Sequence, residues 1–412
     1  MKRRDFLAMA SAASAAMWLP ATRIEASTPR AFTASAYSPG YRNLLILVEL
    51  KGGNDGLNTV VPYADPAYYR LRKNIGIKRG QLIQLDGRTA LHSALQPLMP
   101  LWEAGELAIV QGVSYAQPNL SHFRSIEIWD TASRADQYLR EGWLSRAFAQ
   151  RPVPVGFAAD GVFIGSAETG PLAHGSRAIA LVDPMHSVLL SPRVARGSAQ
   201  ARKPGNARIS SLGNDIAKAG SAARPEASSD HERPEPDTAF PSGAFGASIR
   251  AAMQALDGHN AAKGFTLGGR DVAVIRLTLN GFDTHQNQSG RHAALLAQLA
   301  EGLAAMKAAL VGMGRWDSTL VMTYSEFGRH PRENPGKGTD HGTVAPYFAT
   351  GGRVRGGLYG VPPLLAQLDG NGNLPVGVDF RQLYATVLEL WWGLDSSNVL
   401  GERLAPLPLL RV

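Results

Sequence analysis

The stretch NLLILVELKGGNDG, residues 43–56, decides the fold class of this 412-residue chain. Its first eight residues form a nearly continuous apolar run, which is typical of a parallel strand covered on both faces. Three later runs share this pattern, and each is followed by polar residues: LAIVQGV (107–113), DVAVIRLTL (271–279) and TLVMTY (319–324). The four runs predict an α/β fold with a doubly wound, mostly parallel sheet and helices on both faces.

Between and after these runs, apolar residues recur at helical spacing. We therefore expect helices over residues 91–101, 124–131, 143–148, 245–256, 289–313 and 380–392. The glycines at 52 and 53 lack the downstream glycine and helix of a dinucleotide-binding loop, and the chain has no P-loop.

The amino-acid composition excludes several kinds of partner and site. A hydrophobic content of 44% in 412 residues is ordinary for a globular protein with a large core. The net charge is +8, but no basic run resembles a nucleic-acid-binding arm, so we expect no nucleic-acid partner. The chain has no cysteine, which excludes disulfides, thiolate zinc sites and a cysteine nucleophile. Any metal must be held by nitrogen and oxygen.

The amino terminus has the features of a targeting segment. Arg3 and Arg4 precede Phe6-Leu7 and a short alanine-rich stretch, so residues 1–30 predict a twin-arginine export signal, with the export machinery as a partner. An ordinary secretory signal or a membrane anchor is the alternative. We expect a periplasmic or secreted protein without a stable membrane span, in which residues 31–412 form one domain. Residues 195–240, rich in Ser, Ala, Gly and Pro, predict a flexible inserted segment.

Polar clusters follow the four predicted strands, and ligands in such sheets bind beyond the carboxyl ends of strands. The clusters should therefore converge on one site. They supply enough ligands for one or two divalent cations: Asp55, Asp283, His285, Glu326, Asp340 and His341. Asp283 and His285 alternate, so both should point the same way. Asp340 and His341 are adjacent, so a common centre requires a turn there. Zinc, calcium, magnesium and manganese stay open, although an oxygen-rich set with two good histidines leans away from a zinc pair.

The motifs GGNDG (52–56), GFDTH (281–285), SEFGR (325–329) and TDHG (339–342) make the chain resemble a bacterial family known as domain of unknown function 1501. That family is in turn similar to the alkaline phosphatase and sulfatase superfamily. The resemblance implies an alkaline phosphatase-like fold with two metals, in which Ser121 stands at the nucleophile position and Asp55 at the first metal aspartate. It also implies that Glu326 ends a later strand as a ligand, while Phe327 stands where a histidine is expected.

The resulting hypothesis is an exported metal-dependent hydrolase of phosphate or sulfate esters, acting on a small or polymer-borne anionic substrate. Ser121 would be the nucleophile, His122 an acid or base, and Arg329 a stabiliser of developing charge. Each also has a structural interpretation: Ser121 as a helix cap, His122 as a backbone partner, and Arg329 as a salt-bridge partner. The alternative is a catalytically degenerate exported binding or assembly protein, favoured by Phe327 and by the close spacing of Asp283 and His285.

Overall fold

The computed structural model describes residues 39–183, 188–190, 239–258 and 266–411. The predicted export signal and nearly all of the predicted insertion lie outside the described residues. The account below concerns the compact unit that spans Ser38–Val412.

The largest sheet has the strand order β14-β5-β13-β10-β1-β9-β6-β7-β8, with β15 paired to β5. Strand β1 is parallel to both of its neighbours, β9 and β10, whereas β13 and β8 run antiparallel to theirs. This confirms the predicted mostly parallel sheet. The strands are β1 (Leu44–Lys51), β5 (Leu107–Ser114), β6 (Ala159–Ile164), β7 (Ala178–Asp183), β8 (Val188–Leu190), β9 (Val272–Asn280), β10 (Thr319–Tyr324), β13 (Ala345–Thr350), β14 (Gly357–Gly360) and β15 (Val378–Asp379).

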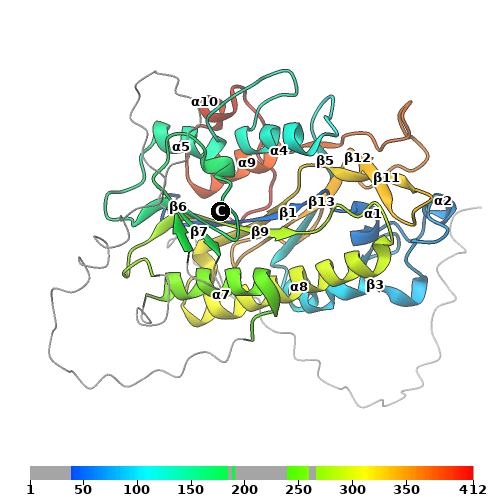
Figure 1. The fold of residues 1–412 in the computed structure, drawn as a ribbon, viewed down its shortest axis with the longest axis horizontal. Coiled ribbons are helices and arrows are strands. Elements are labelled where there is room, and N and C mark those ends of the chain that lie inside the picture. The colour runs from blue at the N-terminus through cyan, green and yellow to red at the C-terminus, as the bar shows by residue number, and fades with distance from the viewer. Residues whose placement is uncertain (1–38, 184–187, 191–238, 259–265, 412) are drawn as a thin grey trace, which may run out of the picture. The chain divides into compact units, whose positions relative to one another are not determined.

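Helices cover both faces of this sheet, as predicted (Figure 1). One face carries α7 (Gly243–Asp257) and α8 (Gln288–Gly312); the other carries α4 (His122–Thr131), α5 (Trp143–Gln150), α9 (Arg381–Ala385) and α10 (Ser396–Leu400). Strand β1 shows why its sequence lacks polar alternation. Leu45 and Leu47 pack into the core under α4 and α5, while Leu44, Ile46 and Val48 pack into the core under α7 and α8. Both faces of the strand are buried, so both need apolar side chains.

Two smaller sheets and several short helices complete the unit. A three-stranded sheet has the order β2-β4-β3, and β11 and β12 form an antiparallel pair. Their bounds are β2 (Val60–Val61), β3 (Leu82–Gln84), β4 (Ala90–His92), β11 (Gly328–Glu333) and β12 (Thr339–Gly342). The short helices are α1 (Gly56–Thr59), α2 (Pro66–Leu71) and α3 (Met99–Glu103), with 3₁₀ turns at Arg79–Gln81, Ser93–Leu98, Gly170–Leu172 and Trp316–Ser318.

Two sequence predictions need correction. The helix expected over residues 91–101 begins as β4, continues as a 3₁₀ turn and becomes α3 only at Met99. Pro97 and Pro100 explain this, because proline has no backbone N–H to donate in a helix interior. The helix expected over residues 380–392 changes from α9 to a π-helical turn over Thr386–Trp391. Within the described ranges, α8 is the helix long and apolar enough to cross a membrane, but 56% of its most apolar window is buried.

Candidate metal centre

Four loops meet at one edge of the large sheet. They follow the carboxyl ends of β1, β5, β9 and β10, whose parallel alignment brings these ends together, and the β11–β12 hairpin lies beside them (Figure 1). The sheet therefore gathers residues that are far apart in the chain, as the strand pattern predicted.

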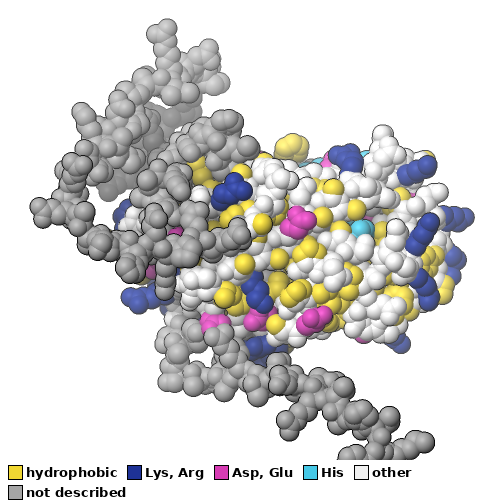
Figure 2. Space-filling model, turned by 90° about the horizontal axis from the view of Figure 1, so that it is seen from below, with side chains coloured by type: hydrophobic (Ala, Val, Ile, Leu, Met, Phe, Trp, Pro, Cys, Tyr) yellow, Lys and Arg dark blue, Asp and Glu magenta, His cyan; other side chains and the backbone are white. Residues whose placement is uncertain are grey.

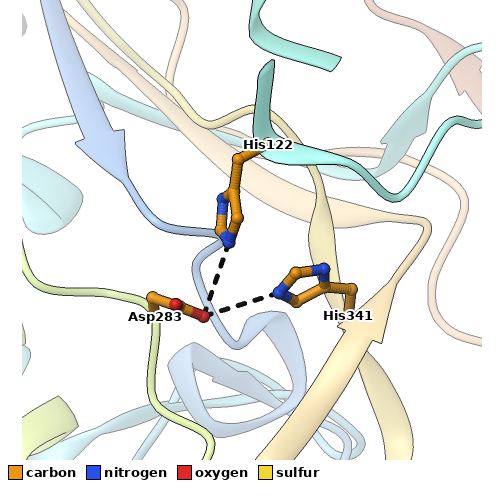
Figure 3. Close-up of side chains that lie close together, drawn as sticks. All are labelled: His122, Asp283 and His341. Atoms are coloured by element: carbon orange, nitrogen blue, oxygen red, sulfur yellow. Dashed lines mark ion pairs between the residues drawn. The ribbon is translucent and has the colours of Figure 1, made fainter. Parts of the chain in front are cut away.

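His122, Asp283 and His341 lie closest together in this region. They come from the start of α4, the loop after β9 and strand β12, and Figure 3 shows their side chains pointing at one another. Their ligand atoms all lie within 4.8 Å of one another. The Nε2 atoms of His122 and His341 are 3.6 and 3.5 Å from Asp283 Oδ1. His285 lies beside them, with its Nε2 3.0 Å from the same carboxylate oxygen, but it is not one of the three residues whose ligand atoms all lie within 4.8 Å of one another.

The outer nitrogens of the three rings are all directed at acceptors. His341 Nδ1 donates to the Leu120 carbonyl at 2.7 Å, His122 Nδ1 is 2.8 Å from Glu326 Oε1, and His285 Nδ1 faces Asp340 Oδ1 at 3.6 Å. A carbonyl can only accept, so the proton of neutral His341 sits on Nδ1 and its Nε2 lone pair faces the cluster. Metal-bound histidines are commonly oriented in this way by a partner on their other nitrogen.

The spacing of the inner atoms fits a single cation. His285 Nε2 and His341 Nε2 are 3.0 Å apart, too close for both to carry a proton. Around a tetrahedral zinc with Zn–N bonds of about 2.0–2.1 Å, neighbouring ligand atoms lie about 3.3 Å apart. The distances of 3.0 to 3.6 Å around Asp283 Oδ1 bracket that value. Imidazole nitrogens and a carboxylate oxygen are ligands that a borderline divalent cation accepts.

Arg329 ties the loops of this centre together. Its side chain is fully buried and donates to the carbonyls of Gly53 at 2.9 Å, Thr339 at 3.0 Å and Phe282 at 3.1 Å, as well as to that of Gly52. It also contacts Asp283 Oδ1 at 2.6 Å. Partial burial raises the pKa of Asp283, but the Arg329 guanidinium outweighs it, so the pKa is lowered. Because protein carbonyls already occupy the donors of Arg329, its arrangement suits positioning better than the predicted contact with a substrate.

Asp55 was predicted as a metal ligand, but the structure gives it a different environment. Its carboxylate pairs with Arg72 Nη1 at 2.6 Å, both side chains are fully buried, and Gln288 donates to the same oxygen. Burial raises the pKa of Asp55, yet the adjacent guanidinium holds it below its usual value. Arg72 also donates to the carbonyls of His330 and Pro331. Asp55 therefore links the GGNDG loop to α2 and β11 and does not join the cluster.

Glu326 and Asp340, also predicted as ligands, lie behind the histidines. Glu326 accepts from the Gly52 N–H at 2.9 Å and also faces His122. The hydrogen bond between Glu326 and His122 raises the pKa of His122. Asp340 is 69% exposed and accepts from Asn334. Asp340 and His341 are neighbours on strand β12, so their side chains point to opposite faces, and the turn that would have brought both inward is absent. Glu326 orients the His122 ring by a hydrogen bond, whereas Asp340 lies near His285 at 3.6 Å.

Ser121 and Phe327 border the cluster. Ser121 is exposed at the N-cap position of α4, but its side chain makes no capping hydrogen bond. The Phe327 ring lies 4.9 Å from the His122 ring and 4.5 Å from the His341 ring. Phe327 stands where the sequence resemblance implies a histidine ligand. His122 was expected as an acid or base, or as a backbone hydrogen-bond partner, and not as a ligand. Its place directly after Ser121, beyond the end of a strand, was the signal for its role as a possible ligand.

These observations define an α/β protein with a histidine-rich, metal-type site at the carboxyl edge of a mostly parallel sheet. The chain belongs to the family described as "Protein of unknown function (DUF1501)", whose profile matches residues 42–404. It matches no curated protein.

Several solved structures are similar over most of their length. A crystal structure of Ps i-CgsB in complex with k-i-k-neocarrahexaose is 10% identical, with 89% of this chain and 73% of that chain covered and a TM-score of 0.39. The lipoteichoic acid synthase LtaP from Listeria monocytogenes is 10% identical, with 86% and 72% covered and a TM-score of 0.39. The periplasmic domain of EcEptC from Escherichia coli, a zinc complex, is 9% identical, with 77% and 74% covered and a TM-score of 0.34. At these TM-scores the structures say nothing about what this site does.

Proposed function

We propose that this protein is a metal-dependent hydrolase of phosphate or sulfate esters. One observation carries the proposal: the Nε2 atoms of His122, His285 and His341 surround one oxygen of Asp283, while each outer nitrogen faces an acceptor. Such a centre would hold one divalent cation, and the three imidazoles favour zinc over calcium or magnesium. A second cation is not part of the proposal, because the Phe327 ring packs against His122 and His341.

A bound cation would supply Lewis acidity that polarises the ester and lowers the pKa of a nearby hydroxyl. Ser121 is the candidate nucleophile because it adjoins His122 and its hydroxyl caps no backbone N–H. Its oxygen would bond to phosphorus or sulfur, the bond to the leaving alcohol would break, and that alcohol would depart with the serine proton. Water would then cleave the seryl ester and restore Ser121. The uncapped first turn of α4 adds backbone N–H groups that favour an anion.

The test is a metal analysis combined with a panel of chromogenic phosphate and sulfate esters. The native protein should carry about one equivalent of metal, and His341→Asn should lose it. His174→Asn is the matched control, because His174 is exposed and outside the cluster, and asparagine tolerates its positive φ of 54°. Ser121→Ala should keep the metal and lose turnover. Full turnover by Ser121→Ala would refute its nucleophilic role, and a metal-free native protein would refute the centre.

The second candidate is an exported binding or assembly protein that keeps the fold and the metal without turnover. Two observations favour it: Phe327 replaces an implied ligand, and the donors of Arg329 are occupied by backbone carbonyls. Metal binding without hydrolysis of any ester in the panel would support this candidate against the first.

The proposal includes export by the twin-arginine route to the periplasm or beyond. It rests on Arg3 and Arg4 in the sequence. A double replacement, Arg3→Lys with Arg4→Lys, should leave the protein in the cytoplasm of its host. Unchanged export would point to an ordinary secretory signal.

A further inference from the structure

One end of the molecule carries an excess of positive charge. Residues 66–88 contain five exposed basic side chains and one exposed acid, Asp86. We call these five the basic end: Arg70, Lys73, Lys78, Arg79 and Arg88. Figure 2 shows Lys and Arg gathered at the end where Figure 1 places α2 and β3.

The acids beside the basic end keep their negative charge, but in the described residues they accept from backbone N–H groups and form no ion pair with these five cations. Asp86 accepts from the backbone N–H groups of Arg88 and Thr89, Asp65 from that of Ala67, and Glu333 from that of Asn74. No ion pair within the described part of the chain engages any of the five cations. These charges therefore face solvent and remain available to an anionic partner.

The basic end also has a hollow of about 410 Å³, lined by Tyr63, Ala64, Pro66, Tyr69, Lys78 and Arg79. The Arg79 guanidinium lies 5.8 Å from the centre of the Tyr63 ring, and the Tyr63 hydroxyl donates to the Asp86 carbonyl. Lys78 and Arg79 line the hollow, and their positive charges favour an anionic group there. The other three cations of the basic end add positive charge around it.

The basic end is joined to the metal centre through strand β11. Arg72 of the segment donates to the carbonyls of His330 and Pro331 on that strand, and Asn74 bonds to Glu333 at its end. The same strand carries Arg329, which contacts Asp283. Arg72 and Asn74 thus connect the segment that carries the basic end to the hairpin that builds the centre.

We propose that the basic end binds an acidic polysaccharide, one that bears repeated sulfate or phosphate esters. The binding stands on charge and shape, while the idea that it delivers an ester to the metal centre rests on the proposed function. The aromatic side chains argue against single-stranded nucleic acid. Bases stack on exposed rings, but Tyr63 is only 8% exposed and Tyr68 is fully buried. Tyr69, the third ring beside the hollow, is half-buried and packs edge-on against Tyr68, so the surface offers five cations and a single partly exposed tyrosine among these three.

The experiment measures binding of the full-length exported protein to dextran sulfate, phosphorylated dextran and neutral dextran. The test variant is Lys73→Glu, Lys78→Glu and Arg79→Glu together. Its control reverses three exposed arginines elsewhere, Arg140→Glu, Arg291→Glu and Arg403→Glu, so both variants have the same net charge. We expect the test variant to bind at least about tenfold more weakly and the control to change less than about twofold. If each contact releases counterions as on duplex DNA, a fourfold rise in salt weakens binding about threefold per contact.

Equal losses in the two variants would overturn the proposal, because they would show that overall charge is responsible. Tight binding of neutral dextran would also overturn it, as would tighter binding of single-stranded DNA than of either anionic dextran. The two anionic dextrans distinguish sulfate from phosphate. Repeating the titration with His341→Asn separates the two proposals, because binding at the basic end should persist when the metal centre is disabled.

Discussion

Replacing Asp55 with asparagine distinguishes a ligand from a structural anchor. The Asp55–Arg72 pair is 2.6 Å long and neither side chain is exposed, so Asp55→Asn leaves a buried guanidinium without its counter-charge. Loss of one partner of a buried pair costs about 3–5 kcal/mol. Arg72 keeps three other acceptors, Asn58 Oδ1 and the carbonyls of His330 and Pro331. We therefore expect the free energy of unfolding to fall by about 3 kcal/mol, at the lower end of that range.

The assay is denaturant unfolding of metal-free protein, followed by metal analysis of the folded variant. Asp283→Asn is the reciprocal variant, because the Asp283 side chain is 48% exposed and the buried Arg329 keeps four backbone carbonyls as acceptors when the carboxylate is removed. Asp55→Asn should lose more stability and keep the metal, whereas Asp283→Asn should lose less stability and lose the metal. The opposite pattern, with metal lost from a stable Asp55→Asn protein, would show that Asp55 is a ligand and that our interpretation is wrong.

Three further predictions concern the surroundings of the centre. Glu326→Gln should weaken metal affinity by about 10- to 100-fold without unfolding the protein, since Glu326 orients His122; unchanged affinity in a competition titration would argue against this role. Phe123 is 89% exposed beside His122, so Phe123→Ala should raise KM for ring-bearing esters several-fold at unchanged melting temperature, and an unaltered KM would exclude substrate contact. Burial lowers the pKa of His292 to about 4, so the unfolded chain takes up its proton first as the pH falls from about 6.5. The contribution of His292 to the free energy of unfolding is then fully present above about pH 6.5 and decreases by about 3 kcal/mol toward pH 4. Denaturant unfolding measured across this pH range should show a smaller decrease in His292→Gln.

The carboxyl ends of the strands were predictable because local pattern determines them. Continuous apolar runs locate β1, β5, β9 and β10 to within about one residue, since strands buried on both faces require such runs. The helix expected over residues 124–131 begins two residues earlier, at His122, and the length of α8 follows an equally local signal. Proline-containing segments were harder, as residues 91–101 show, because a missing backbone N–H interrupts a helix whose side-chain pattern is otherwise favourable.

The roles of individual carboxylates could not be predicted, because they depend on partners distant in the chain. Asp55 and Asp283 look alike in sequence, each in a glycine-containing loop after a strand. Asp55 is buried against Arg72 and Gln288, whereas Asp283 opens toward His122, His285 and His341. Nothing local marks which carboxylate meets a guanidinium.

The sequence by itself determined that this chain folds into a mostly parallel α/β sheet and that its polar clusters share one edge. The reason is that strands buried on both faces require continuous apolar runs, which can be recognised in the sequence. Only the tertiary structure decided which of those side chains face one another. Pairing of β11 with β12 turned His341 inward and Asp340 outward, and the start of α4 brought His122 over Asp283. The direction of a side chain follows from the register and packing of its element, and these are fixed by contacts between distant segments.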